Sequence, residues 1–309
     1  MKCKLKNAKS LLLSLLVMAL WGSLFPMIKI GYDTLSINSS DVPSILMFAG
    51  VRFLICGGVI LIIAALKRDN IKALGSRTIG SMLLIGLFSI TLHYAFTYLG
   101  LGSTDSSKTA LLKQVGALIY VSVAFLFFKN EKFSIWKILG AVVGFSGIVA
   151  INFNSSGVSA LTLGDCMILL ASVCTVISSI LTKKTVEGCS AFLLTGISQL
   201  FGGVLLAIAS LVLGGGEMTL TVIGVLVFLY ICTASTVAYL LWNHLLKTSE
   251  VSNMLVIKFA EPMFACIFGA VLLGEDIFRW QYPVAFILIS GGILLANKRI
   301  REKNEGENI

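Results

Sequence analysis

Four ionisable side chains lie inside long apolar stretches of the sequence, where a charge is costly unless it is paired or functional. They are Arg52, Lys113, Lys258 and Glu261. Three cations against one carboxylate leave excess positive charge, which would attract an anionic, carboxylate-bearing or phosphate-bearing ligand. A structural interpretation remains open, because Lys258 and Glu261 are three positions apart on one helix and can neutralise each other. Arg52 can instead bind backbone carbonyls, and Lys113 can reach toward the surface.

The two lysines are expected at similar depths. With a rise of 1.5 Å per residue and a core of ~30 Å, Lys113 and Lys258 come out about 8 Å apart along the membrane normal. The internal repeat described below pairs Lys258 with Gln114. We therefore predict a central polar cavity that binds substrate through Lys113, Gln114, Lys258 and Arg52.

Aromatic residues supply candidates for the cavity wall. Trp21 and Tyr94 are expected deep in their spans and are predicted to line the cavity, and Tyr239 is a further candidate. Tyr98 and Trp242 lie near span ends, where Trp and Tyr form interfacial belts.

Glu261 has a further possible role, since a carboxylate exposed alternately to the two faces of the membrane could carry a proton in exchange for the substrate. Pro262 follows it directly. Proline removes a backbone donor and is tolerated where a transporter helix lines a cavity, so we predict a helix break there. An ion pair and simple packing are the alternatives for Glu261.

Other chemistry has no support in the sequence. His93 and His244 are far apart, and no HExxH, GxSxG or GxxxxGK[ST] motif occurs, so an enzyme or an ATP-driven pump is not predicted. We interpret His93 as a buried hydrogen-bonding residue. The seven cysteines show no CxxC spacing. No metal site and no cofactor are predicted.

The composition requires a lipid bilayer around the residues above. Mean hydropathy is +0.96, and 57% of residues are hydrophobic while 13% are charged, against roughly 25% charged in soluble domains. We predict an all-α integral membrane protein with ten transmembrane helices. The expected spans are 10–30, 44–66, 78–101, 105–128, 135–153, 164–182, 191–213, 220–244, 251–273 and 280–297.

The distribution of positive charge predicts the orientation. Lys and Arg concentrate in the N-terminal segment, every second connection and the C-terminal tail, whereas the opposite side carries only Lys108 and Arg279. Both termini are therefore expected in the cytoplasm of a multi-pass cell-membrane protein. The net charge of +9 is explained by the lipid surface, so no nucleic-acid partner is predicted.

The chain contains a weak internal repeat. Equal spacing relates three pairs, which are Glu131 and Glu275, Trp136 and Trp280, and Gly147 and Gly291. We divide the chain into a first five-helix repeat at 1–153, a second at 160–298 and a basic cytoplasmic tail at 299–309. Five crossings reverse the start of the next unit, so the repeats are inverted, as in many secondary transporters. Glu131 and Glu275 fall at span ends, where we expect them to cap or pair.

Several motifs resemble the EamA-type branch of the drug/metabolite transporter superfamily over nearly the whole chain. They are Trp21-Gly22-Ser23-x-Phe25, Arg52-Phe53, Gly164-Asp165, Glu261-Pro262-x-Phe264-Ala265 and Leu273-Gly274-Glu275. The resemblance implies a ten-helix carrier or exporter of small metabolites. One departure is the first-half counterpart of Pro262, which is Leu118, with Gly116 as the nearest residue that could loosen the helix.

These patterns predict a secondary active transporter, an exporter or an exchanger, that moves a small metabolite, anionic or carboxylate-bearing, by alternating access. Protons are the candidate coupling ion. A proton-coupled exporter of cationic drugs is the alternative, and it requires Glu261 to be free of Lys258. An integral-membrane enzyme and a channel are disfavoured. The sequence assigns no oligomeric state.

Overall fold

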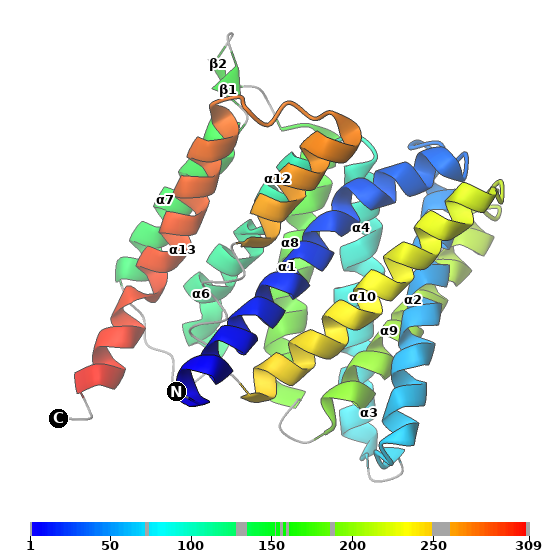
Figure 1. Cartoon of the computed structure of the whole chain (residues 1–309), viewed down its shortest axis with the longest axis horizontal. Helices are drawn as coiled ribbons and strands as arrows, with labels where there is room; N and C mark the ends of the chain where they lie inside the picture. The colour runs from blue at the N-terminus through cyan, green and yellow to red at the C-terminus, as the bar shows by residue number, and fades with distance from the viewer. Residues whose placement is uncertain are drawn as a thin grey trace.

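A computed structural model describes residues 2–71, 74–127, 135–151, 153–154, 157–158, 161–185, 189–248 and 260–306 of the chain. Its elements form a helical bundle (Figure 1). In chain order they are α1 (Lys2–Thr34), α2 (Val42–Leu66), α3 (Ser76–Gly86), the π-helix η2 (Leu87–Leu92), α4 (His93–Leu101), α5 (Ser106–Lys113), α6 (Val115–Phe127), α7 (Ile135–Ile151), β1 (Phe153–Asn154), β2 (Gly157–Val158), α8 (Leu163–Thr185), α9 (Ala191–Val212), α10 (Val222–Thr248), α12 (Ala260–Leu273) and α13 (Gln281–Gly306).

Helices long and apolar enough to cross a bilayer dominate the bundle. Within the described residues there are six, at Leu12–Thr34, Val42–Leu66, Ser76–Leu101, Leu163–Thr185, Ala191–Val212 and Val222–Trp242. Large apolar side chains remain exposed along many helices, as expected of surfaces that face lipid; examples are Ile62, Val142, Leu170, Leu211, Leu226, Val271 and Ile287. The chain is thus a multi-pass membrane protein, and the total of ten spans stays a prediction.

Three features depart from uniform spans. The predicted span at 78–101 contains the π-helix η2 in its middle. The span at 105–128 is divided, because α5 ends at Lys113 and α6 begins at Val115. The predicted join between the halves contains a short antiparallel hairpin, β1 with β2, so the chain is not purely helical. Residues 251–259, the first part of the ninth predicted span, lie outside the described residues.

Helices distant in sequence pack together. α2 packs along α9, and α7 packs along α13, on opposite sides of the bundle in Figure 1. α1 packs between α10 and α12, while α8 packs against α4, α5 and α6. Both chain ends lie at the lower side of Figure 1. We call the opposite side, where α1 and α12 end and the β1–β2 hairpin lies, the distal end.

Glycines bring the backbones of paired helices into contact. A Cβ atom on Gly57 of α2 would lie 2.6 Å from the backbone nitrogen of Leu200 on α9. On the other side of the bundle, a Cβ on Gly292 of α13 would lie 2.6 Å from the nitrogen of Gly144 on α7. No side chain fits in either space, so Gly57 and the Gly144–Gly292 pair permit close packing of the helix backbones.

Adding one methyl group at Gly57 should separate these helices. We expect Gly57→Ala to destabilise the protein by about 1–3 kcal/mol, since overpacking displaces backbone that cannot yield locally. The neighbouring Gly58 offers a matched control, because a Cβ there meets nothing within 4 Å. Gly58→Ala should be neutral or stabilising by up to about 1 kcal/mol, as alanine favours helix. Thermal unfolding in detergent compares the two variants, and equal losses would contradict the packing argument.

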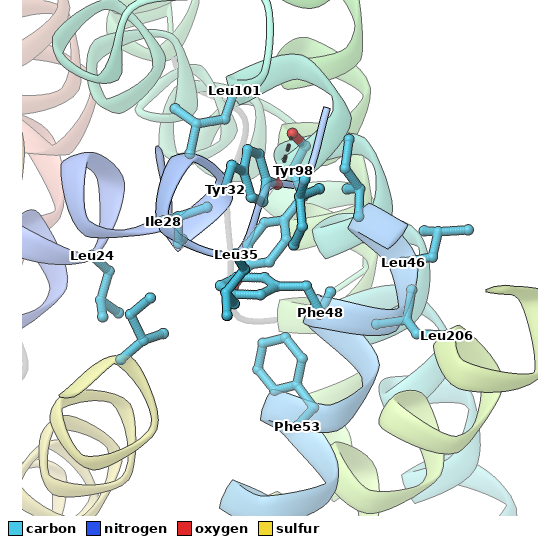
Figure 2. Close-up of a cluster of buried hydrophobic side chains, with 14 of the residues drawn as sticks. Leu24, Ile28, Tyr32, Leu35, Leu46, Phe48, Phe53, Tyr98, Leu101 and Leu206 are labelled. Carbon is cyan, nitrogen blue, oxygen red and sulfur yellow. Dashed lines mark hydrogen bonds between the residues drawn. The ribbon is translucent and has the colours of Figure 1, made fainter. Parts of the chain in front are cut away.

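A cluster of buried aromatic side chains fills the space between α1, α2 and α4 (Figure 2). The rings of Tyr32 and Phe48 are 5.5 Å apart and meet edge to face. The Tyr32 hydroxyl donates to the backbone carbonyl of Tyr98 at 3.3 Å. Tyr98 is fully buried, so these contacts fix the side chain that the candidate site uses next.

Candidate functional site

Among the residues that the structure describes, Arg52 of α2 is the largest fully buried side chain, with 1% of its surface exposed. Its guanidinium donates to the hydroxyl of Tyr98 and, at 2.6 Å, to the Ser235 hydroxyl of α10. Its central carbon lies 4.8 Å from the ring centre of Phe53 and 5.4 Å from that of Tyr94. Arg52 therefore occupies an aromatic cage, with cation–π contacts offsetting part of the loss of hydration.

Among the described residues, the aromatic cage provides no carboxylate to neutralise the charge of Arg52. Within the part of the chain that the structure describes, Arg52 forms no ion pair, and its Nε atom has no hydrogen-bond partner. A buried guanidinium without a carboxylate is costly, because neutral hydroxyls replace lost water incompletely. The arrangement can accept an anion, and two-pronged binding of carboxylate or phosphate suits arginine in particular.

Lys113 of α5 also contacts Tyr94, one of the rings around Arg52. It is the last residue of α5, where the helix dipole favours a cation. Its Nζ atom lies 5.2 Å from the ring centre of Phe25 and 5.7 Å from that of Tyr94. Tyr94 thus contacts both Arg52 and Lys113, so the structure brings three of the predicted site residues together.

The position of Tyr94 follows from an irregular helix. Tyr94 is the second residue of α4, directly after the π-helix η2, and π-turns rotate the side chains that follow them. The adjacent His93 ring packs edge to face on Tyr94 at 4.7 Å. His93 Nδ1 lies 2.9 Å from the carbonyl of Ala171 and 2.9 Å from the hydroxyl of Thr175 on α8. The interpretation of His93 as a buried hydrogen-bonding residue is confirmed.

Trp21 joins the site through α10. Its ring centre is 5.7 Å from that of Tyr239 and 5.3 Å from that of Trp242. The Tyr239 hydroxyl lies 3.3 Å from that of Tyr94. An aromatic surface therefore runs from Trp21 to the two cations.

Two residues expected at the interface belong to this aromatic group. Tyr98 is fully buried and bonded to Arg52, so the prediction that it belongs to an interfacial belt was wrong. Trp242 packs on Trp21, and its place in such a belt stays a prediction. Sequence reasoning also missed Phe53 and Ser235. Phe53 follows Arg52 directly, and that adjacency was the available signal.

Gln114 is buried at the break between α5 and α6. Its backbone nitrogen donates to the carbonyl of Leu111 at 3.1 Å, a tightened last turn of α5. The first-half helix therefore breaks at Gln114, two residues before Gly116 and without a proline. The correspondence of Gln114 with Lys258 and its role in binding substrate stay predictions.

The second-half candidates are described only in part. Lys258 lies outside the described residues, so its pairing with Glu261 stays a prediction. Glu261 is half-buried in the first turn of α12, and its carbonyl lies 2.9 Å from where a Cβ on Gly22 would be. α12 thus meets α1 beside Trp21. Pro262 is buried in that first turn, a position that tolerates proline, and the predicted break before it falls on residues outside those described.

A separate polar cluster lies at the distal end. Glu275, just beyond α12, accepts hydrogen bonds from the backbone nitrogens of Ser106 at 2.7 Å and Ser107 at 3.0 Å, and from the Ser107 hydroxyl at 2.6 Å. Lys29 Nζ lies 3.8 Å from the same carboxylate. Glu275 therefore caps α5, which confirms the expectation for this residue.

A second ion pair lies near the first turn of α8. Lys108 binds Asp165 at 2.8 Å. The backbone nitrogen of Thr162 donates to the Asp165 carboxylate at 3.0 Å. In return, the backbone nitrogen of Asp165 donates to the Thr162 hydroxyl at 3.1 Å. This reciprocal arrangement is a capping box, which explains Gly164-Asp165 as the start of a helix.

Comparison with known proteins gives matches along nearly the whole chain. The model of the EamA-like transporter family matches residues 8–153 and 162–298. An uncharacterized transporter of Archaeoglobus fulgidus is 27% identical over 94% of this chain and 96% of its own length. The uncharacterized transporter YvbV of Bacillus subtilis is 24% identical over 94% of this chain and 90% of its own length. A crystal structure at 18% identity superposes with a TM-score of 0.65 over 96% of this chain and 98% of that chain, a likeness of fold.

Proposed function

Because the chain belongs to the EamA-like transporter family, we propose that it is a secondary active transporter of a small anionic or carboxylate-bearing metabolite. It works in the cell membrane by alternating access, as an exporter or an exchanger. Both termini lie in the cytoplasm, so the distal end faces outward. The family indicates a transporter rather than an enzyme.

The observation that carries the substrate class is the buried cation Arg52. Within the described residues its hydrogen bonds go to neutral hydroxyls only, and Tyr94 links it to a second cation, Lys113. A bound carboxylate or phosphate would complete the missing countercharge. Tyr94, Trp21 and Tyr239 would pack against the rest of a small ligand, since aromatic side chains give a flat wall with few rotamers.

The packing of the helices supports two inverted repeats, 1–153 and 160–298. If α1 corresponds to α8, α2 to α9, α4 to α10, α5 with α6 to α12, and α7 to α13, the packed pairs exchange consistently. α2 with α9 and α7 with α13 map onto themselves, whereas α1 with α10 maps onto α8 with α4, and α1 with α12 maps onto α8 with α5 and α6. Halves related in this way can rock against each other around a shared site.

A cationic cargo is the second candidate. Trp21, Tyr239 and Trp242 form an aromatic surface suited to a cation, and Glu261 lies in the first turn of the helix that packs beside Trp21. In that case the protein is a proton-coupled drug exporter.

Thermal unfolding of purified protein separates the two candidates. The panel contains anionic, zwitterionic and cationic metabolites, since a ligand at 100 times its Kd stabilises the folded state by about 2.7 kcal/mol. Stabilisation by carboxylates or phosphate esters supports the proposal. Stabilisation by cations alone would reject it in favour of drug export.

Glu261 provides a test of proton coupling. If Glu261 carries the proton, Glu261→Gln should lose all acceleration of transport by an imposed pH gradient, because an amide does not titrate, while exchange at equal pH persists. Uptake into proteoliposomes with and without the gradient measures this. Glu217→Gln, on the connection between α9 and α10, is the control. A Glu261→Gln protein that still responds to the gradient would exclude the role.

A further inference from the structure

Contacts around one carboxylate join α12 to α5 and α1 at the distal end. The side chain of Glu275 is 7% exposed, and it belongs to the second proposed repeat. Within the described residues, the hydrogen-bond and ion-pair partners of its carboxylate, Lys29, Ser106 and Ser107, belong to the first. Hydrogen bonds from helix amides to a carboxylate are strengthened by the full charge and by the helix dipole. Glu275 therefore joins the two repeats at the distal end.

A left-handed turn aims Glu275 back at α5. Gly274 has φ +66°, a conformation that glycine adopts without strain. The nitrogen of Gly274 donates to the carbonyl of Ala270 at 3.1 Å, and that of Glu275 donates to the carbonyl of Gly269 at 3.2 Å. This C-terminal cap of α12 reverses the chain. The Leu273-Gly274-Glu275 motif is thus the device that places the carboxylate on the neighbouring helix.

The contact between α12 and α5 leaves no room for a further side chain. A Cβ on Gly269 would lie 2.6 Å from the Glu275 carboxylate and 2.7 Å from the Ser107 hydroxyl. One helical turn deeper, the Cys266 side chain lies beside that of Ser107. The two helices are therefore in direct contact from Glu275 inward.

A cavity of about 320 Å³ lies immediately beyond this contact. Lys29, Asp33, Asp105 and Glu275 contribute to its lining, and Asp33 and Asp105 are exposed. Glu275 faces this cavity and α5 at once. It therefore lies between the distal cavity and the first turn of α5.

We propose that Glu275 is the distal gate of the transport pathway: it closes the path by binding the first turn of α5, and the path opens when that carboxylate leaves Ser106 and Ser107. The inference rests on the proposed alternating-access function. Charge on Glu275 holds the gate shut, and Gly269 permits the close approach.

A reversible cross-link between the two helices tests the gate. The Cys266 side chain of α12 lies beside that of Ser107 on α5, so a cysteine at position 107 would bring two thiols within reach of each other without adding bulk at Gly269. The variant Ser107→Cys, in a background in which Cys266 is the only other cysteine, should stop exchange of radiolabelled succinate and glycerol phosphate when oxidised. Reduction should restore it, and the same variant with Cys266→Ala should be insensitive to oxidant. A fully cross-linked protein that exchanges at the reduced rate would overturn the gate.

Labelling of Cys266 gives a readout that needs no transported compound. With Cys266 as the sole cysteine, Glu275→Gln should raise its rate of reaction with a membrane-impermeant maleimide, added from the distal side, by about fivefold or more. Asp276→Asn is the matched control, since Asp276 pairs with Arg279 on the exposed surface. Ser103 is exposed at the distal end. Labelling of a Ser103→Cys variant from outside the vesicles therefore shows whether the distal end faces outward in the vesicle preparation.

The two readouts separate the gate from the proposed function. Faster labelling in Glu275→Gln, with the rate in Asp276→Asn unchanged, supports the gate even if neither radiolabelled compound is transported. The lack of transport would count only against the proposal of an anionic cargo. Equal labelling in both variants overturns the gate, whatever the transport assay shows.

Discussion

Replacing Lys113 with methionine should abolish both anion binding and transport while the protein remains folded and in the membrane. Removing one member of a buried charge pair typically costs about 2–5 kcal/mol of binding, a loss of about 30-fold or more. Methionine retains the length and apolar contacts of the lysine stem against Phe25. Lys258→Met is predicted to act in the same way.

The controls for Lys113 separate local from general charge effects. Lys183→Met removes an exposed cation near the end of α8 and should leave binding unchanged. Thermal shift with the anions of the panel measures binding, and proteoliposome exchange measures transport. Full activity in Lys113→Met and in Lys258→Met would exclude the proposed anion site.

Arg52→Met should separate stability from function. Because Arg52 is buried without an ion pair among the described residues, an apolar side chain of similar length should leave Tm unchanged or raise it. Transport should nevertheless be lost, since the guanidinium that binds the substrate anion is gone. Losing an interaction of about 2–5 kcal/mol with the substrate anion corresponds to a fall in its affinity of at least about 30-fold. This combination is characteristic of a charge retained for function.

Arg52→Lys is the companion variant. It keeps the charge but loses the planar, two-pronged geometry, so it should retain weak transport. The hydrogen bonds to Tyr98 and Ser235 would be lost in Arg52→Met and weakened in Arg52→Lys, so a purely structural arginine predicts a lower Tm in both variants. A fall in the stability of Arg52→Met by more than about 3 kcal/mol, with transport retained in whatever folds, would show that Arg52 serves the fold.

Hydropathy and charge predicted much of the architecture because lipid allows few alternatives. The six long apolar helices of the described residues begin and end within a few residues of predicted spans. The same reasoning placed Arg52, Lys113 and Tyr94 at membrane depth, and they meet in one aromatic cage. A charge inside an apolar run is a strong signal because its burial is so costly.

Depth along a helix was a poorer guide to lateral position. Tyr98 lies near the end of a predicted span, but α1 continues to Thr34 and its Tyr32 covers Tyr98. Lys29 in the first predicted span lies 3.8 Å from the carboxylate of Glu275, which is distant in sequence. Contacts of this kind depend on which helices are neighbours, and that information is not local in sequence.

Irregular helix geometry also escaped the sequence. The π-helix before His93 and the break at Gln114 contain no proline. Both are stabilised by tertiary contacts, such as the bonds of His93 to Ala171 and Thr175. Gly116, which lies two residues beyond the break at Gln114, was the one signal in the sequence, and the π-helix had none. Both irregularities adjoin residues of the candidate site, as strained segments often do.

The most direct test is counterflow in proteoliposomes that contain the purified protein and no nucleotide. Vesicles are loaded with unlabelled succinate and glycerol phosphate, or with an aromatic cation, and the corresponding radiolabelled compound is added outside. The account predicts transient accumulation of a labelled anion in wild-type vesicles and none in Arg52→Met or Lys113→Met vesicles. Accumulation of the cation alone, unaffected by both substitutions, would contradict it.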